Sequence, residues 1–293
     1  MAEIRRSGTW GSALSADEFT AIRSVGFAPA GQVLGAAVYN IGYTGGYGCA
    51  GAWSGYWGGP LGPVRSVTQT SSRGGVSSFA PLVQALYEAR HTAINRMTAE
   101  CAALGGHGVV GVKLTIGRFP AGGLEFKAIG TAVRAPGAPP RRVPFTSDLS
   151  GQDFSKLIMR GWVPAGLALG ISVAARHDDW TTVGQTRWSS GNAEVAGYTE
   201  LVNEGRHDAR IQLEREVRQI GAEGVVIADM QMRVSDRECP VAEGGRDHIV
   251  EVTIIGTSIA RFAAPQKPEH GREPSIAVLS LDPQRRQAAR VRI

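Results

Sequence analysis

The 293-residue chain is poor in cysteine, with Cys49, Cys101 and Cys239 far apart in the sequence. No C-x-x-C pair occurs, and the number of thiols is odd. This spacing argues against a thiolate zinc site and against a fold held together by disulfides. We therefore predict that the thiols are free.

Other absences exclude further classes of protein. No run of ~20 consecutive apolar residues is present, so we expect no transmembrane span. The first residues lack an apolar h-region, which favours a cytoplasmic location. No P-loop, G-x-S-x-G elbow or dinucleotide-binding glycine motif occurs in the required setting, so we predict no enzymatic activity and no catalytic residues.

The net charge of +5 is modest and unevenly placed. The excess arginines lie at Arg141 and Arg142 and near the end, at Arg285, Arg286, Arg290 and Arg292. Neither group is combined with aromatic residues in a motif typical of nucleic-acid binding. We interpret them as a solvated linker and tail, and expect no nucleic-acid partner.

The chain contains a pattern that is written twice. Twelve residues between Ser12 and Val38 recur, exactly matched or conservatively replaced, 135 positions later, between Ser147 and Val173. A second block, including Glu88, Arg90, His91 and Glu100, recurs 116 positions later, and Ile129-Gly130-Thr131 returns at 255–257. The sequence therefore predicts a tandem duplication of one domain.

Periodicity predicts the same elements in each copy. Capping residues at Ser15 and Ser150 open short helices, and strands follow at 33–41 and 168–174. Long helices with one apolar stripe end at Gly105 and Gly221. Two strands complete each copy, at 109–116 and 124–133, then at 225–234 and 249–259. We expect an α+β fold in which a long helix packs on a small antiparallel sheet in each domain.

The domain boundaries follow from composition. Residues 1–134 form the first repeat, with a glycine-rich and aromatic loop at 41–63. Residues 135–146 form a proline-rich linker, which prolines keep extended. Residues 147–262 form the second repeat, and 263–293 an irregular basic tail with one expected strand at 276–281.

The first copy resembles the YbjQ-like domain family, which is associated with heavy-metal binding. The resemblance is carried by Ala89-Arg90, Ala93, Met97, Ala103-Leu104-Gly105 and Val109-Val110-Gly111-Val112, with Gly31 to Ala36 and Gly130 to Val133. The second copy matches less well. The resemblance implies two tandem dodecin-like domains, each with a short extra N-terminal helix, that assemble into a ring with five-fold symmetry.

A segment without charge separates the first strand from the long helix. No charged residue occurs from Ser24 to Val64. Its aromatic residues are candidates for lining a pore, a membrane surface or a groove for an unidentified protein partner, because tyrosine and tryptophan suit half-wet surfaces. A plain surface loop is the alternative. These residues are Tyr43, Tyr47, Trp53, Tyr56 and Trp57.

Arg90 and Arg206 occupy matching positions on the apolar stripes of the long helices. A guanidinium buried there without partners is costly, so each is expected to bond a carboxylate or backbone carbonyls. We favour an assembly contact for both residues, with an anion site as the alternative.

Both long helices carry E-x-x-H, as Glu88 with His91 and Glu204 with His207. A carboxylate and an imidazole on one helical face can share a divalent metal ion, which is the candidate cofactor. A solvated Glu–His pair is the simpler interpretation.

These observations predict a non-enzymatic, ring-forming homo-oligomer with a structural role and a site for metal or a small ligand. Heavy-metal storage or sensing is the alternative, and binding of nucleic acid or a membrane surface through the tail or the aromatic loop is a third. We expect a homopentamer with two stacked tiers, in preference to a trimer of six alternating domains.

Overall fold

A computed structural model describes residues 11–41, 67–72, 79–120, 122–139, 143–239 and 246–261, all within one compact unit. It is a mixed α/β structure with two four-stranded sheets. No helix in the described part of the chain is long and apolar enough to cross a membrane.

We call residues 11–134 the N-terminal half and residues 145–261 the C-terminal half. The N-terminal half contains α2 (Ala16–Ser24), β1 (Ala28–Tyr39), β2 (Gln69–Thr70), α3 (Ala80–Ala103), β3 (Gly108–Arg118) and β4 (Leu124–Arg134). The C-terminal half contains β5 (Phe145–Thr146), α4 (Gly151–Met159), β6 (Trp162–His177), α5 (Trp180–Gln185), a 3-10 turn (Trp188–Ser190), α6 (Ala196–Ile220), β7 (Gly224–Glu238) and β8 (Arg246–Arg261).

The predicted helix signals are confirmed in both halves. Ser15 and Glu18 form a reciprocal capping box at the start of α2, and the Ser150 hydroxyl accepts from Asp153 N at the start of α4. Gly105 and Gly221 lie just beyond the long helices with φ of 71° and 75°. That left-handed backbone ends a helix, and glycine adopts it without steric cost.

Each half contributes three long antiparallel strands to its own sheet. The first sheet has the order β1-β4-β3-β5 and the second has the order β2-β6-β8-β7. β1 pairs along its length with β4, and β6 pairs in the corresponding way with β8. β5 runs parallel to β3, and β2 crosses to the second sheet to pair with β6. β1 and β7 therefore lie at edges of their sheets.

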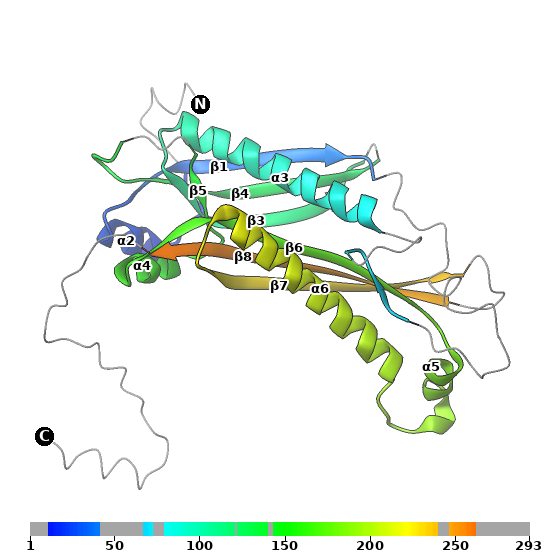
Figure 1. Ribbon diagram of the computed structural model, residues 1–293. Coiled ribbons are helices and arrows are strands. Elements are labelled where there is room, and N and C mark those ends of the chain that lie inside the picture. Colours follow the sequence, from blue (N-terminus) through cyan, green and yellow to red (C-terminus); the bar gives the residue numbers. More distant parts are fainter. Residues whose placement is uncertain are drawn as a thin grey trace, which may run out of the picture. The chain divides into compact units, whose positions relative to one another are not determined.

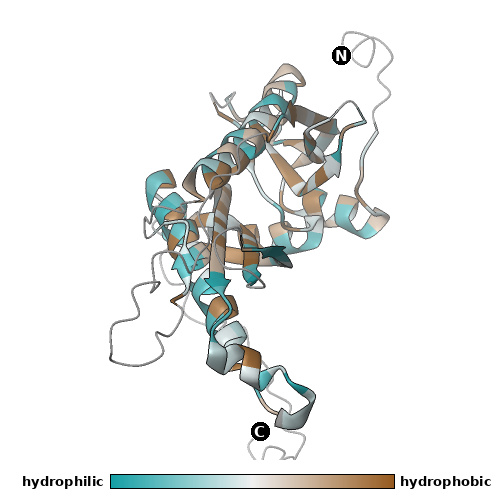
Figure 2. Ribbon diagram, turned by 90° about the vertical axis from the view of Figure 1, so that its right-hand side faces the viewer, coloured by the Kyte–Doolittle hydropathy of each residue, from teal (hydrophilic) through white to brown (hydrophobic). Residues whose placement is uncertain are grey.

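Helix α3 contacts both sheets, whereas α6 covers only the second (Figure 1). Leu169, Ile171 and Val173 of β6 share a core with α3, and Ala168 and Ala174, which flank this run, share a core with α6. This alternation follows because successive strand side chains point to opposite faces. Figure 2 shows hydrophobic residues in the strands and residues of both kinds along the helices. The second sheet is therefore buried on both faces over β6.

The long helices approach the first strands closely because glycine stands at the crossing point. A Cβ at Gly35 would lie 1.9 Å from the Ala93 carbonyl oxygen, and one at Gly170 would lie 2.2 Å from the Ala209 carbonyl oxygen. Both distances are far below a van der Waals contact. The matching glycines therefore set the same helix-to-strand spacing in both halves.

Several features depart from the sequence predictions. The predicted linker ends in β5, because Phe145 and Thr146 find an open edge on β3. β2, α5 and the 3-10 turn were not predicted, and β6 extends well beyond 168–174. Cys101 is free and buried as expected, but Cys239 is disulfide-bonded, so the prediction of free thiols is wrong for that residue.

Candidate assembly surface

The two halves are joined by strand addition at the edge of β3. Ser147 N donates to Val109 O at 2.9 Å, and Gly111 N donates to Leu149 O at 2.9 Å. Val112 N donates to Ser147 O at the same distance. Residues 145–149 thus close the first part of an edge strand that would otherwise expose its amides and carbonyls.

The same segment is fixed to its own half by side-chain hydrogen bonds. Asp148 N donates to Thr257 Oγ1 at 3.1 Å, and Leu149 N donates to Ser147 Oγ at 3.2 Å. Thr257 Oγ1 in turn donates to the Asp148 carboxylate. Burial raises the pKa of Asp148, and the Thr257 hydroxyl acts in the opposite direction. The segment therefore belongs structurally to the C-terminal half while it pairs with the N-terminal half.

A small hydrophobic core forms behind this junction. It joins Ile22 of α2 and Val110 of β3 to Phe145, Leu149 and Phe154 of the C-terminal half. The Phe27 ring contacts Phe154 edge-on at 5.2 Å between centroids. Burial of these aromatic side chains supplies the nonpolar part of the contact between halves.

Polar contacts also link half-buried residues of α3 to β6 and α6. Ile171 N donates to the Tyr87 hydroxyl at 2.9 Å, and that hydroxyl donates to Leu169 O at 3.3 Å. His91 Nε2 lies 3.0 Å from Glu216 Oε1, and Glu216 Oε2 accepts from Leu169 N at 2.6 Å. Burial raises the pKa of Tyr87 far above its ordinary value, so this hydroxyl remains a neutral donor.

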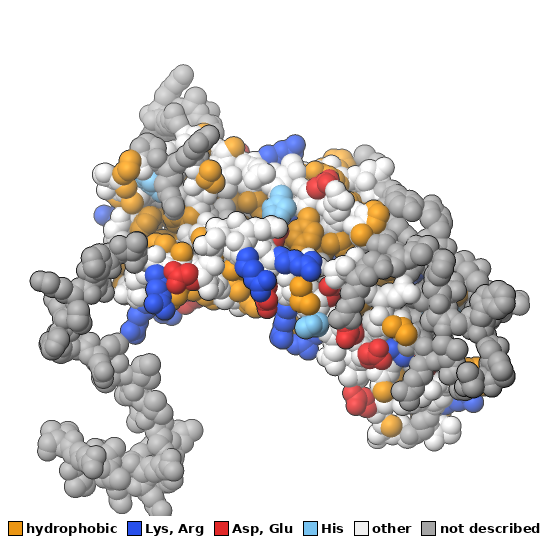
Figure 3. All heavy atoms as spheres, in the orientation of Figure 1, with side chains coloured by type: hydrophobic (Ala, Val, Ile, Leu, Met, Phe, Trp, Pro, Cys, Tyr) orange, Lys and Arg blue, Asp and Glu red, His pale blue; other side chains and the backbone are white. Residues whose placement is uncertain are grey.

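The edge strand β7 presents a large apolar surface to solvent. Nearly all its side chains are exposed or half-buried, although β8 pairs along its other edge. Five large hydrophobic side chains are between 36% and 59% exposed: Val226, Ile227, Met230, Met232 and Val234. Figure 3, which shows one face of the molecule, has charged side chains of both signs over α6. β7 therefore differs from the neighbouring helix by its exposed apolar character.

A second apolar surface lies on the outer side of β1. Leu34 and Val38 are 43% and 48% exposed, and both point away from α3. Leu34 N is nevertheless satisfied, because it donates to Glu100 Oε2 of α3 at 2.9 Å. The corresponding contact in the C-terminal half is the one between Leu169 N and Glu216.

Arg90 is buried, as predicted, and contacts both halves. Its guanidinium donates to Leu86 O at 3.3 Å and to Thr253 Oγ1 of β8 at 3.4 Å, and it lies over the Phe126 ring. Burial lowers the pKa of Arg90 to about 10. Arg206 is half-buried, and its Nε atom has no hydrogen-bond partner among the residues that the structure describes.

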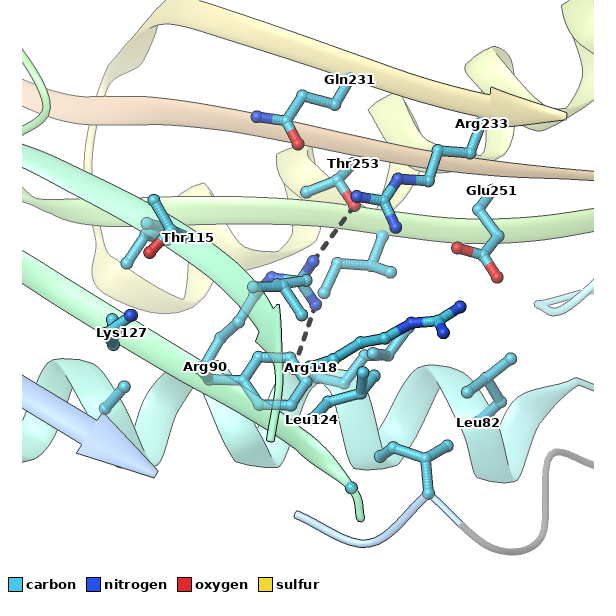
Figure 4. A pocket seen from close by; sticks show the side chains of 18 of the residues that line it. Leu82, Arg90, Thr115, Arg118, Leu124, Lys127, Gln231, Arg233, Glu251 and Thr253 are labelled. Atoms are coloured by element: carbon cyan, nitrogen blue, oxygen red, sulfur yellow. Dashed lines mark hydrogen bonds between the residues drawn. The ribbon is translucent and has the colours of Figure 1, made fainter. Parts of the chain in front are cut away.

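Arg90 reaches into a cavity of about 740 Å³ between α3, the β3–β4 hairpin and the β7–β8 strands (Figure 4). The lining is mainly apolar, with Leu82, Ile116 and Phe126 among its residues. Arg118, Lys127 and Arg233 also line it, and among the described lining residues Glu251 supplies the one carboxylate. The anion site remains a prediction, and the excess of positively charged side chains around the cavity is compatible with it.

The four predicted metal ligands are not brought together. Glu88 is exposed and accepts from Gln84 at 2.9 Å, and His91 contacts Glu216 instead of Glu88. Glu204 and His207 belong to α6, where His207 is exposed. In the described ranges, these residues form no cluster of three or more metal-ligating groups. The family's association with heavy metals therefore does not fit their geometry.

A cluster of His177, Cys239 and Asp247 has ligating atoms within 4.8 Å of one another. Cys239 is disulfide-bonded, so it supplies no thiolate. His177 Nδ1 lies 2.9 Å from Asp247 Oδ1, and Arg237 lies 3.3 Å from Oδ2 of the same carboxylate. This cluster is satisfied by internal contacts.

The predicted aromatic residues Tyr43, Tyr47, Trp53, Tyr56 and Trp57 lie outside the described residues, as does the expected strand at 276–281. Sequence reasoning did not single out Glu100 and Glu216 as contact residues. The signal was available, because both glutamates recur within the repeated blocks.

Comparisons with known proteins give two matches. The YbjQ family model, described as "Putative heavy-metal-binding", matches residues 70–136. The encapsulin nanocompartment protein Rv1762c of Mycobacterium tuberculosis is 30% identical over 262 residues, which cover 85% of each chain. No solved structure matches.

Proposed function

The chain belongs to the same family as the M. tuberculosis encapsulin nanocompartment protein, and from this we propose that it is a self-assembling subunit of a protein compartment. This relative overturns the functional prediction made from the sequence. We replace the three predicted roles with a shell-forming role. They were a metal-binding ring protein, a metal store or sensor, and a binder of nucleic acid or membranes.

The observation that carries the proposal is the exposed apolar edge of β7. An edge strand offers unpaired backbone groups, and natural proteins usually protect such edges with charge, proline or a covering segment. β7 carries charged residues, Asp229 and Arg233 among them, but between them it also exposes Val226, Ile227 and three further large hydrophobic side chains. Apolar surface of this kind marks an interaction site.

One finer inference accompanies the proposal. We infer that the two halves are tandem copies of one dodecin-like domain, since the order of short helix, strand, long helix and two strands occurs in both. The matching glycines at 35 and 170 and the matching carboxylates at 100 and 216 support that inference. Self-association would then bring together domains of common origin.

Native mass spectrometry of the full chain tests the proposal. We expect the wild-type protein to form a multimer at micromolar concentration. Met232→Glu places a charge on the apolar face of β7 and is expected to weaken association at least tenfold. Trp188→Glu is the matched control, because Trp188 is fully exposed but lies outside β7.

A multimer that Met232→Glu disrupts and Trp188→Glu leaves intact supports the proposal. A wild-type protein that remains monomeric throughout this concentration range contradicts it. Circular dichroism of both variants establishes whether a loss of assembly is accompanied by loss of the fold.

A further inference from the structure

We propose that β7 is completed by residues 11–14 of a second copy, in repetition of the contact that residues 146–149 make with β3 inside each chain. This inference rests on the proposed self-assembly and names its interface. We assign a second copy to this position for one reason. Each surface that is buried where the two halves meet has a counterpart in the other half, and that counterpart is exposed on the same chain.

Residues 11–14 are held on the N-terminal half as residues 146–149 are held on the C-terminal half. Ala13 N donates to Thr131 Oγ1 at 3.4 Å, and Leu14 N donates to Ser12 Oγ at 3.0 Å. These contacts correspond to those of Asp148 with Thr257 and of Leu149 with Ser147. Residues 11–14 are therefore already held by the N-terminal half of their own chain.

The two segments differ in what lies on their outer side. Ser147 and Leu149 are buried against β3, at 0% and 7% exposure. Ser12 and Leu14 are only half-buried, and no hydrogen bond to Ser12 N or Leu14 O occurs within the described ranges. The N-terminal segment thus has the backbone groups that its counterpart uses for strand addition.

β7 is the counterpart of β3 and has a register shift at the corresponding place, although Gly111 has a φ of 63° and no residue other than glycine in the described ranges has a positive φ. The register of β3 with β4 shifts between Val110 and Lys113, and that of β7 with β8 shifts between Ile227 and Asp229. By the offset of 116 positions, Val109 and Gly111 correspond to Val225 and Ile227. We expect two hydrogen bonds between copies. Ser12 N of the second copy donates to Val225 O of the first, and Ile227 N of the first donates to Leu14 O of the second.

The apolar surfaces correspond in the same way. Leu169 and Val173 are fully buried where α3 meets the second sheet, and their counterparts Leu34 and Val38 are exposed on β1. Leu114 and Ile116 of β3 pack against that same core, and their counterparts Met230 and Met232 are exposed on β7. The exposed residues of β1 and those of β7 therefore correspond to residues that share one buried core within the chain.

A polar contact is predicted by the same offset. His91 contacts Glu216 between halves, and the corresponding residues are His207 and Glu100. His207 is exposed and makes no ion pair or hydrogen bond within the part of the chain that the structure describes. Glu100 already accepts from Leu34 N, as Glu216 accepts from Leu169 N. We expect His207 of one copy to contact Glu100 of the next.

The proposed interface is head-to-tail, because the C-terminal half of one chain contacts the N-terminal half of another. A closed assembly built from such contacts contains the two halves in alternation. Two five-fold tiers, expected from the sequence, would place each half beside copies of itself. The observed contact of β3 with residues 145–149 already joins unlike halves.

Disulfide trapping tests the interface. Thr146 and Val109 are Cα partners across the internal contact, so Gly11 and Val225 are expected to be partners between copies. Gly11 is expected to tolerate a side chain, because a Cβ there meets no atom of the described residues within 4 Å. The double variant Gly11→Cys/Val225→Cys, oxidised with diamide, is expected to form covalent dimers and higher multimers on a non-reducing denaturing gel.

Three controls separate the outcomes. Val109→Cys/Thr146→Cys is expected to crosslink within one chain, and the single variants Gly11→Cys and Val225→Cys are expected to form no ladder. An assembled wild type with no crosslink in Gly11→Cys/Val225→Cys, while the internal control crosslinks, would overturn this interface but leave self-assembly in place. A monomeric wild type in native mass spectrometry would overturn both.

Discussion

His91 and Glu216 connect the long helices of the two halves through a distance of 3.0 Å between Nε2 and Oε1. Glu216 also accepts from the amide of Leu169, a fully buried residue. One carboxylate therefore serves two functions, since it satisfies an amide of β6 within its own half and fixes α3 of the other half.

Glu216→Ala is expected to lower the free energy of unfolding by about 1–3 kcal/mol, because it leaves the buried Leu169 amide without its acceptor. Urea denaturation followed by circular dichroism measures this loss. Glu214→Ala removes a neighbouring exposed carboxylate that pairs with Arg218, and is expected to have little effect. Equal losses in the two variants would contradict the role given to Glu216.

Gly35→Ala and Gly170→Ala are each expected to destabilise the fold by about 1–3 kcal/mol, the usual cost of overpacking. The added Cβ would collide with the backbone of α3 or α6, which cannot move aside as a side chain can. Thermal denaturation measures the effect. Gly117→Ala is the matched control, because its Cβ would meet no atom within 4 Å. A Gly170→Ala protein as stable as Gly117→Ala would contradict the close helix approach.

Acid is expected to weaken the contact between α2 and α4 through Glu18. Its carboxylate accepts from Ser15 N and from Gly151 N of the other half, and the Ser15 bond is the main reason that its pKa lies below 4.5. A lowered folded-state pKa gives stability that is present above 4.5 and is lost as pH falls through the folded value.

Glu18→Gln should therefore be less stable than wild type at pH 7, and the difference should shrink as pH falls below 4.5. Denaturation curves of both proteins between pH 7 and pH 3 provide the measurement. A difference that is constant over this range would show that the charge of Glu18 does not contribute.

Cys101 is expected to resist thiol reagents in the folded protein. It is fully buried, and burial raises its pKa to about 12, so it is a neutral thiol at physiological pH. Iodoacetamide labelling followed by peptide mass spectrometry should find Cys101 unmodified in native protein and modified after denaturation in urea. Rapid labelling of the native protein would contradict the burial.

Much of the fold could be predicted from residues that act locally. Ser15 and Ser150 cap helices through their own backbone neighbours, and Gly105 and Gly221 end helices through their own backbone conformation. The recurrence of these signals at constant offsets also predicted the order of the elements. Arg90 was placed correctly on the buried stripe of α3 by helical periodicity alone.

The site was harder to predict, because its contacts join residues that are far apart in the sequence. E-x-x-H spacing placed Glu88 and His91 on one helix, but His91 contacts Glu216, which lies 125 positions later. The linker prediction missed β5, because a short segment becomes a strand only when the edge of β3 is available to pair with it. The disulfide of Cys239 was missed for the same reason, since cysteine spacing does not reveal proximity in space.

By itself, the sequence determined the short helices, the long helices and most of the long strands, and their recurring order, because helix caps, glycine conformations and hydrophobic periods depend on near neighbours. Only the tertiary structure decided which half covers which surface. It buried Leu169 and Val173 while leaving Leu34 and Val38 exposed, although the two pairs stand at matching places in the repeated pattern. The physical reason is that burial depends on what packs against a face: Leu169 and Val173 share a core with α3, whereas Leu34 and Val38 remain 43% and 48% exposed.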